Sequence, residues 1–465
     1  MSLHDTIAAV STPYGKGGIA VLRISGDKAS DIAEKVFKPL SGKPLSMTEH
    51  GRAVYGNIYF PPENPEEAPR QIDDGMAVYF KAPRSFTGED TVEISCHGGI
   101  LVTQKVLFAL QKAGARAAGP GEFTKRAFIN GKLKLSQAEA LGNLLDAEND
   151  EQIAVARAGM RGVLTEKTKP VYESLRDVLA AVFAHIDYPD EDLADLSDDE
   201  MISTLNSAVS ELKNIAGTYR TGKAITQGIS TVICGKTNAG KSSVYNRIVG
   251  RDAAIVTDIE GTTRDILCEK VTMGKVMLRL SDTAGLRDSD DPVEKIGINR
   301  AYDALADAEL VFAVFDGNSE PDERDINFAA KIKGLNKIGV AVINKTDMGT
   351  FDYSRVTNEF EYSVQVSAKT GEGFDKLSEL VNDIYIDKNL DTGHDALLIN
   401  ARQYFAVSQA IGFARQAIEH INQNMPLEIC CADIENAMQS LGEIDGRAVS
   451  EDIVQKIFSS FCVGK

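Results

Sequence analysis

The sequence predicts an α/β plus all-α fold in which one α/β domain is inserted into a helical domain. Three patterns support this: strand-like alternation near the N-terminus, helical spacing of apolar residues over 121–186, and strands alternating with helices from Ile229 to about Asp383. At 465 residues the chain exceeds what one hydrophobic core usually supports, so several domains are expected. We place them at residues 1–118, 119–220, 221–383 and 384–465, where the second and fourth are the two halves of the helical domain.

The N-terminal domain is predicted to be α/β because short apolar or alternating runs are separated by loop-forming residues. Residues 60–70 carry prolines and acids that a strand interior does not accept, so they form a loop. A helix is expected over Leu101–Ala113. The predicted strands are Ile19–Ile24, Ala53–Phe60, Met76–Phe80 and Thr91–Ser95.

The later segments differ in character. Over 121–186 glycine and proline are sparse, which predicts long helices; another helix is expected over Met201–Tyr219, and helices return after Thr392. Between them, strand–helix alternation predicts a parallel sheet covered on both faces. Its expected strands are Ser230–Cys234, Val276–Leu280, Leu310–Phe315, Ile338–Ile343 and Ser363–Val366.

The charge of the chain is uneven. The net charge is -18, which argues against a protein coated in nucleic acid. Eight acids lie in Asp187–Glu200, whereas residues 105–134 carry a net +6. That basic stretch is either a solvated helix face or a path for nucleic-acid phosphates. Its members are Lys105, Lys112, Arg116, Lys125, Arg126, Lys132 and Lys134, against Glu122.

The cysteines and apolar runs bear on the compartment. The six cysteines form no CxxC pair and no zinc-type spacing. The N-terminus has no secretory apolar core, and no run is long enough to span a bilayer. We therefore expect a reduced, cytoplasmic protein without a membrane segment.

The strongest functional signal is the segment Gly235–Ser242, which matches G-x4-GK[ST]. It follows a predicted strand and opens a predicted helix at Ser242, the context in which such a loop wraps phosphates with its backbone N–H groups. Lys241 is expected to reach the β- and γ-phosphates, and the Ser242 hydroxyl to ligate Mg²⁺. The sequence therefore predicts a nucleoside triphosphate site.

Three further motifs follow in order, each after a predicted strand. Asp282–Gly285 (DTAG) supplies an acid near the magnesium site and a backbone N–H for the γ-phosphate. Asn344–Asp347 (NKTD) ends in a carboxylate that can accept two hydrogen bonds from guanine, and Ser367–Lys369 (SAK) closes the base pocket. Together the four motifs resemble the Ras-like, translation-factor-type GTPase superfamily, whose activity is hydrolysis of GTP to GDP.

One superfamily feature is absent. Leu286 stands where Ras relatives carry the glutamine that orients the attacking water, and no arginine finger is evident in the chain. Asn238 and the segment Thr257–Thr262 offer oxygens suited to a monovalent cation, and Thr263 is a natural second Mg²⁺ ligand. The residues expected to contact GTP are Asn238, Ala239, Gly240, Lys241, Ser242, Ser243, Thr257, Asp258, Ile259, Glu260, Gly261, Thr262, Thr263, Asp282, Thr283, Ala284, Gly285, Asn344, Lys345, Thr346, Asp347, Ser367, Ala368 and Lys369.

The whole chain resembles a narrower family. An NAGKS phosphate loop, a GTTRD segment, DTAGLR, an N-terminal α/β domain, a split helical domain and the C-terminal residues Phe461–Lys465 (FCVGK) are similar to the MnmE (TrmE) family of tRNA modification GTPases. The resemblance implies a homodimer joined through N-terminal domains of tetrahydrofolate-binding type. It implies a flavoprotein partner, MnmG, which carries the FAD and forms a heterotetramer with this chain. The implied reaction adds an aminomethyl or carboxymethylaminomethyl group to C5 of the wobble uridine of certain tRNAs.

The same resemblance implies site residues. A folate, 5,10-methylenetetrahydrofolate or 5-formyltetrahydrofolate, would contact Arg23, Glu93, Lys132 and Lys465. K⁺ would be held by Asn238, Thr257, Ile259 and Thr262, and would replace the arginine finger when two G domains face each other. Glu294 would orient the water, acting with Lys241 and Thr263 in catalysis. The role of Cys462 stays open.

Plainer explanations exist for several of these residues. Arg23 and Glu93 lie on predicted strands, where charges often pair, and Lys132 could be a solvated turn residue. Glu294 could be a helix N-terminal charge, and Cys430 and Cys431 are most simply buried packing. A regulatory GTPase switch without one-carbon chemistry is the main rival function, and a membrane-remodelling GTPase is a weaker one because no amphipathic basic anchor stands out.

Overall fold

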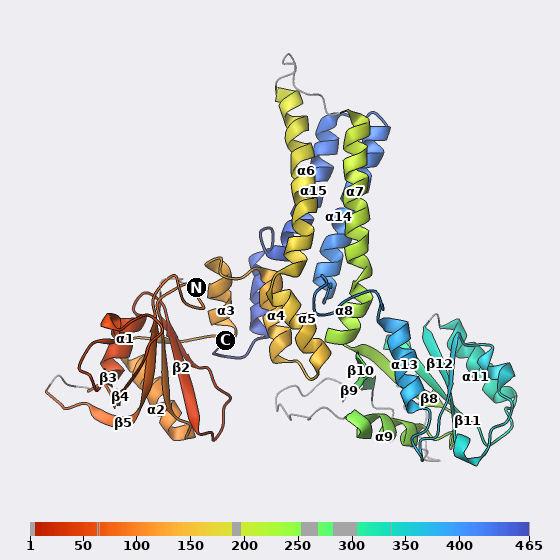
Figure 1. The fold of residues 1–465 in the computed structure, drawn as a ribbon, viewed down its shortest axis with the longest axis horizontal. Coiled ribbons are helices and arrows are strands. Elements are labelled where there is room, and N and C mark those ends of the chain that lie inside the picture. The colour runs from red at the N-terminus through yellow and green to blue at the C-terminus, as the bar shows by residue number, and fades with distance from the viewer. Residues whose placement is uncertain are drawn as a thin grey trace, which may run out of the picture. The chain divides into compact units, whose positions relative to one another are not determined.

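The computed structural model describes residues 5–62, 64, 66–187, 197–252, 268–281, 305–335 and 337–464. The chain divides into two compact units, which we describe separately: residues 1–142 with 442–465, and residues 143–441. Figure 1 traces both along the chain.

The first unit is built on a seven-stranded sheet with the order β3-β4-β5-β6-β2-β1-β7. Neighbouring strands are antiparallel except β1 and β7, which are parallel. The four predicted strands are confirmed, although β5 is longer than expected, and β1, β3 and β7 lie in segments where no strand was predicted. The strands are β1 Ile7–Val10, β2 Ile19–Ser25, β3 Phe37–Pro39, β4 Ala53–Phe60, β5 Arg70–Phe80, β6 Thr91–His97 and β7 Arg116–Ala117.

Helices α1 (Ala29–Val36) and α2 (Ile100–Ala113) cover one face of this sheet (Figure 1). Their buried side chains share one core with alternate residues of the strands, such as Leu22 and Ile94. Because successive strand residues point to opposite faces, Arg23 and Glu93 lie on the other face. That second face is not covered by α1 or α2, and it carries the functional candidates of the unit.

The end of the chain belongs to the same unit. Val454 and Phe458 of α16 pack on Leu135 and Ala138 of α4. The tail then reaches β1, because the Ser11 hydroxyl donates to the Gly464 carbonyl at 3.1 Å. The helices here are α3 Glu122–Ile129, α4 Leu135–Leu145 and α16 Glu451–Ser459, and a 3-10 turn spans Leu45–Met47.

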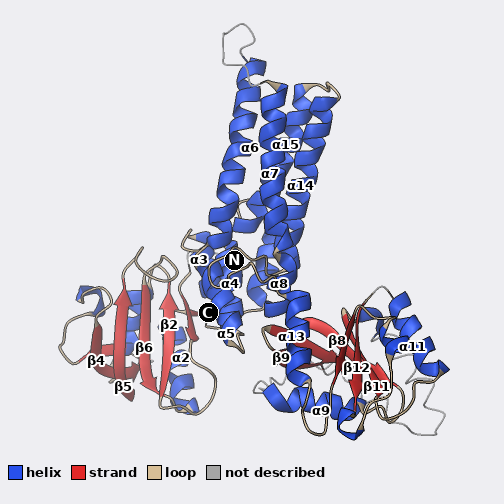
Figure 2. Cartoon of the chain, turned by 45° about the vertical axis from the view of Figure 1, so that its right-hand side comes forward, coloured by secondary structure: helices blue, strands red, loops and turns tan. Residues whose placement is uncertain are grey.

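The second unit begins with helices that confirm the predicted helical segments. Long helices α6, α7, α14 and α15 lie alongside one another, so segments before and after the inserted domain pack together (Figure 2). The rings of Tyr219 in α8 and Tyr404 in α14 stack with 4.5 Å between their centroids, which joins a helix before the inserted domain to a helix after it. The helices are α5 Asp150–Met160, α6 Val163–Asp187, α7 Asp198–Gly217, α8 Tyr219–Thr226, α14 Ala401–Asn422 and α15 Leu427–Asp445.

The inserted domain holds a six-stranded sheet with the order β13-β12-β11-β8-β10-β9. Its core lies on both faces, with α9 and α13 on one and α11 on the other, which confirms a doubly covered sheet. The strands are β8 Ile229–Gly235, β9 Cys268–Met273, β10 Val276–Ser281, β11 Leu310–Asp316, β12 Ile338–Asn344 and β13 Tyr362–Gln365; the helices are α9 Lys241–Asp252, α11 Glu323–Gly334, α12 Ser354–Thr357 and α13 Phe374–Tyr385, with a 3-10 turn at Thr346–Met348.

The five predicted strands of this sheet pair in parallel, as expected, but the sheet has a sixth strand at one edge that was not predicted. Strand β9 pairs antiparallel with β10, and a two-residue turn of Gly274 and Lys275 reverses the chain. Gly274 has a φ of 63°, a conformation that favours glycine. A sequence of strands alternating with helices does not reveal such a hairpin, because no helix separates its two strands.

Candidate functional sites

The phosphate loop joins β8 to α9, and two of its glycines are fixed by close neighbours. A Cβ on Gly235 (φ 153°) would lie 2.2 Å from the Val314 carbonyl oxygen. A Cβ on Gly240 (φ 92°) would lie 2.2 Å from Nδ2 of Asn344. Any side chain at either position would therefore displace the loop. The geometry explains why the motif has glycine at both places.

Two lysines of the phosphate loop form polar contacts that hold its conformation. The Lys236 ammonium lies 2.8 Å from Oδ2 of Asp325 and also pairs with Asp322, both at the N-terminus of α11. The Lys241 ammonium donates to the Lys236 carbonyl at 2.8 Å, so it lies inside the curve of the loop. Ser242 is exposed in the first turn of α9, where a hydroxyl can ligate a metal ion.

Asn344 joins three of the four motifs. It is 1% exposed, its Nδ2 donates to the Ala239 carbonyl at 3.0 Å, and its Oδ1 accepts from the Ala368 N–H at 3.0 Å. Asp347 accepts a hydrogen bond from the Ser367 hydroxyl at 2.8 Å. The phosphate loop and the two base motifs therefore meet at the carboxyl ends of β8, β12 and β13, which builds one continuous nucleotide site.

Other parts of the expected site lie outside the described residues. These are Thr257, Asp258, Ile259, Glu260, Gly261, Thr262, Thr263, Asp282, Thr283, Ala284, Gly285 and Glu294. Of the K⁺ and Mg²⁺ candidates, the structure describes Asn238, which is exposed with a φ of 64°, and Ser242.

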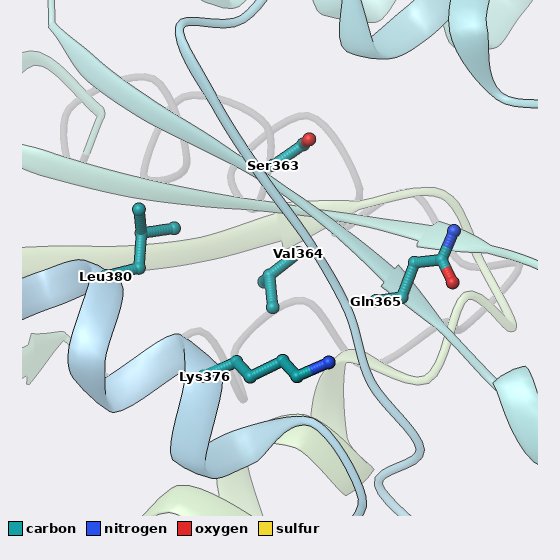
Figure 3. A pocket seen from close by; sticks show the side chains of 5 residues that line it. All are labelled: Ser363, Val364, Gln365, Lys376 and Leu380. Atoms are coloured by element: carbon teal, nitrogen blue, oxygen red, sulfur yellow. The ribbon is translucent and has the colours of Figure 1, made fainter.

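A separate hollow lies at the edge of the same sheet. Figure 3 shows Val364 of β13 pointing toward the helix α13, which carries Lys376 and Leu380. Ser363 and Gln365 complete its lining. None of the nucleotide-motif residues that the structure describes lines this hollow, so we assign it no part in the nucleotide site.

Two of the candidate ligand residues of the first unit, Arg23 and Glu93, meet. Arg23 and Glu93 face each other across β2 and β6, with 2.7 Å between Nη2 and Oε1. The Arg23 guanidinium lies 5.4 Å from the ring centre of Phe86 and 5.7 Å from that of Phe123. The sequence did not single out these two aromatic residues, since nothing in their local pattern marks them.

Lys132 contacts residues 81–90, the segment that also carries Phe86. Its ammonium donates to the Pro83 carbonyl at 3.0 Å, and its Cγ lies 3.3 Å from where a Cβ on Gly88 would stand. Residues 81–90 therefore join Lys132 to Phe86 and Arg23. Lys465 lies outside the described residues, while Gly464 before it packs against Val10.

The basic stretch over residues 105–134 is not one surface. Arg126 is 2% exposed and is surrounded by the carboxylates of Asp5, Glu89 and Glu122. Arg116 pairs with two of the same acids. Arg126 is thus neither a solvated residue nor a contact for RNA phosphates, which corrects both interpretations at this position. The sequence could not show this, because Asp5 is 121 residues away.

Two smaller observations concern the adjacent cysteines and the length of the helices. Cys430 and Cys431 are 2% and 3% exposed, which confirms that they are buried packing residues. Among the described helices, none is both long and apolar enough to cross a membrane.

Comparison with known proteins extends these observations. Residues 135–462 match the model of the MnmE helical domain, and residues 6–132 match that of the GTP-binding protein TrmE N-terminus. A tRNA modification GTPase MnmE of Acetivibrio thermocellus is 38% identical, with all of both chains covered. Proteins of the same name from Symbiobacterium thermophilum and Bacillus subtilis are 39% and 38% identical, each over 99% of this chain and 100% of the relative.

Proposed function

Because this chain belongs to the MnmE (TrmE) family of tRNA modification GTPases, we propose that it couples GTP hydrolysis to one-carbon chemistry on tRNA. It is a GTP-hydrolysing enzyme that acts in tRNA modification. With a flavoprotein of the MnmG type, which carries the FAD, it adds an aminomethyl or carboxymethylaminomethyl group to C5 of the wobble uridine. A folate supplies the carbon unit, and the working form is a homodimer of this chain within a heterotetramer.

The observation that supports the folate site is the ion pair of Arg23 and Glu93 between two aromatic rings. A pteridine has hydrogen-bond donors and acceptors on its edge and a flat apolar face, so it suits charged groups beside Phe86. Side-chain exposure of 21% for Arg23 and 26% for Glu93 leaves both within reach of a ligand. Lys132 and, by the same family pattern, Lys465 would complete the site.

The phosphate loop fits GTP and its ions. Lys241 and the N-terminus of α9 bind phosphate charge, Ser242 would hold Mg²⁺, and Asn238 would hold K⁺ with Thr257, Ile259 and Thr262. The two cations supply positive charge near the phosphates. We assign Thr263 to Mg²⁺ and Glu294 to orienting the water, as the family pattern implies.

The potassium assignment predicts a salt-specific rate. Replacing K⁺ by Na⁺ at equal ionic strength is expected to lower GTP turnover on the order of 10²-fold, because the cation takes the place of an arginine finger worth about 10³–10⁵. GTP affinity measured in both salts is the control, since it should change little. Equal turnover in K⁺ and Na⁺ would contradict the assignment.

The folate assignment is tested in a strain that lacks this protein. The wild-type chain should restore the C5-modified wobble uridine, measured by mass spectrometry of tRNA nucleosides, whereas Arg23→Ala should not. The purified Arg23→Ala variant should retain at least about tenfold less folate, since it loses a charged hydrogen-bonding group. Arg52→Ala is the matched control, because Arg52 is exposed and pairs with Glu49.

This experiment also separates the rival function. A regulatory GTPase switch without one-carbon chemistry predicts normal tRNA nucleosides in the strain that lacks the protein. It also predicts that wild type and Arg23→Ala behave alike. Either result would reject the proposed folate chemistry.

A further inference from the structure

Two loops of the first unit bring exposed cations together. The turn Lys81–Arg84 closes with a hydrogen bond from the Arg84 N–H to the Lys81 carbonyl at 2.9 Å. The Lys132 ammonium donates to the Pro83 carbonyl at the tip of this turn, and Lys134 follows two residues later. We name Lys81, Arg84, Lys132 and Lys134 the loop-cation patch.

The charge of the patch is available to a ligand. All four residues are exposed, and in the described part of the chain none of them forms an ion pair with a carboxylate. The nearby acids are engaged elsewhere: Glu89 binds Arg126, and Asp90 accepts the Ala82 N–H at 2.9 Å. Arg116 and Arg126, by contrast, form ion pairs with carboxylates of the same unit.

We propose that the loop-cation patch binds the ribose-phosphate backbone of the substrate tRNA. Lysine and arginine on adjoining loops suit phosphates, and Arg84 can contact one bidentately. The chain carries a net charge of -18, so its overall field opposes RNA, and RNA binding is favoured where cations gather without paired acids. A patch of four such residues is therefore a docking place for RNA.

The position of the patch supports this role. Residues 81–90 carry both the patch turn and Phe86, whose ring lies beside the Arg23 guanidinium. An RNA strand bound there lies next to the pair Arg23–Glu93. This step rests on the proposed folate site, since a carbon unit bound at Arg23 must come near the uridine. RNA binding itself rests only on the charges.

The test compares two triple variants of the full-length chain. Lys81→Gln, Arg84→Gln and Lys134→Gln together remove three patch charges and spare Lys132, to which we have assigned a folate role. Lys28→Gln, Lys43→Gln and Lys105→Gln together remove three exposed charges of the same unit outside the patch. Both triples change the net charge equally, so a general field effect would be the same in each.

The measured quantity is tRNA affinity over a series of salt concentrations, with the chain alone and with its flavoprotein partner. The patch triple should lower the slope of log affinity against log salt by about 2 to 3, since each phosphate contact contributes about 1. The control triple should leave the slope near that of wild type. Equal slopes for the two triples, alone and with the partner, would overturn the proposal.

Folate retention, measured on the same proteins, separates this inference from the proposed function. A patch triple that keeps folate and loses tRNA supports the RNA surface. If the patch triple binds tRNA like wild type but loses folate, the proposal of an RNA surface is overturned, whereas the proposal of a folate site is not. If the triple unfolds, single Arg84→Gln and Lys134→Gln variants replace it, and each should lower the slope by about 1.

Discussion

Asp347→Asn is expected to lower the affinity for GTP by about 10³-fold and to raise the affinity for xanthosine triphosphate. A site built to accept hydrogen bonds discriminates strongly against a partner whose donors do not match, by about 10⁴–10⁵ in favourable cases. The carboxylate at Asp347 accepts two donors from guanine. An asparagine presents one acceptor and one donor, which suits the additional carbonyl oxygen of xanthine.

The structure indicates why this change should be specific. Asp347 is held by the Ser367 hydroxyl at 2.8 Å, and an asparagine oxygen can accept the same bond. The pocket should therefore keep its shape while its donor pattern changes. Binding of both nucleotides measured by calorimetry checks the result, with Asp352→Asn as the control, since Asp352 accepts from the Ser354 N–H away from the base motifs. An unchanged ratio of the two affinities would place the base selector elsewhere.

The inserted domain could be predicted closely from the sequence because its signals are local. Buried strands such as Leu310–Asp316 appear as continuous apolar runs, and the phosphate loop has a fixed spacing within eight residues. The antiparallel strand Cys268–Met273 was missed, because its six residues mix charged and apolar side chains. Edge strands need fewer apolar residues than central ones.

The first unit was harder because its key contacts are distant in sequence. The short strand Ile7–Val10 and the helix Ala29–Val36 carry too few residues for a clear period. Arg23 and Glu93 could be assigned to one site only by family resemblance, and Phe86 could not be assigned at all. The basic stretch shows the limit most clearly, since exposed Lys132 and buried Arg126 look alike in a list of charges.

Arg126 forms the centre of a charge network that holds the first unit together. Its Nη2 lies 2.5 Å from Oδ1 of Asp5 and 3.2 Å from Oε1 of Glu122, and its Nη1 lies 3.2 Å from Oε1 of Glu89. These carboxylates come from the N-terminus, from α3 and from the loop after β5. Arg116 shares Asp5 and Glu122. Two arginines thus pair with three carboxylates, and the cluster keeps one net negative charge.

Arg126→Ala is therefore expected to lower the free energy of unfolding by about 3–5 kcal/mol, the usual cost of leaving buried charges without their partner. Urea denaturation measures this, and Lys125→Ala is the control. Lys125 is the neighbouring residue, half-buried, with one hydrogen bond to Gln455 at 2.7 Å, so its loss should cost about 1 kcal/mol or less. Similar values for the two variants would mean that the network does not stabilise the fold.

The same network predicts how stability depends on pH. A hydrogen bond from Arg116 is the largest influence on Asp5, and together with a further hydrogen bond from Arg126 it outweighs the effect of burial and lowers the pKa of Asp5 below the usual 3.8. Burial would raise the pKa of Glu122, but Arg116 and the Gly119 N–H outweigh it, so this pKa falls below 4.5. Carboxyl groups with lowered pKa values stabilise the fold above their ordinary pKa and lose that effect as they are protonated. The difference in unfolding free energy between wild type and Arg126→Ala should therefore be constant from pH 6 to 7 and shrink as the pH falls below about 4, whereas a pH-independent difference would assign the loss to packing alone.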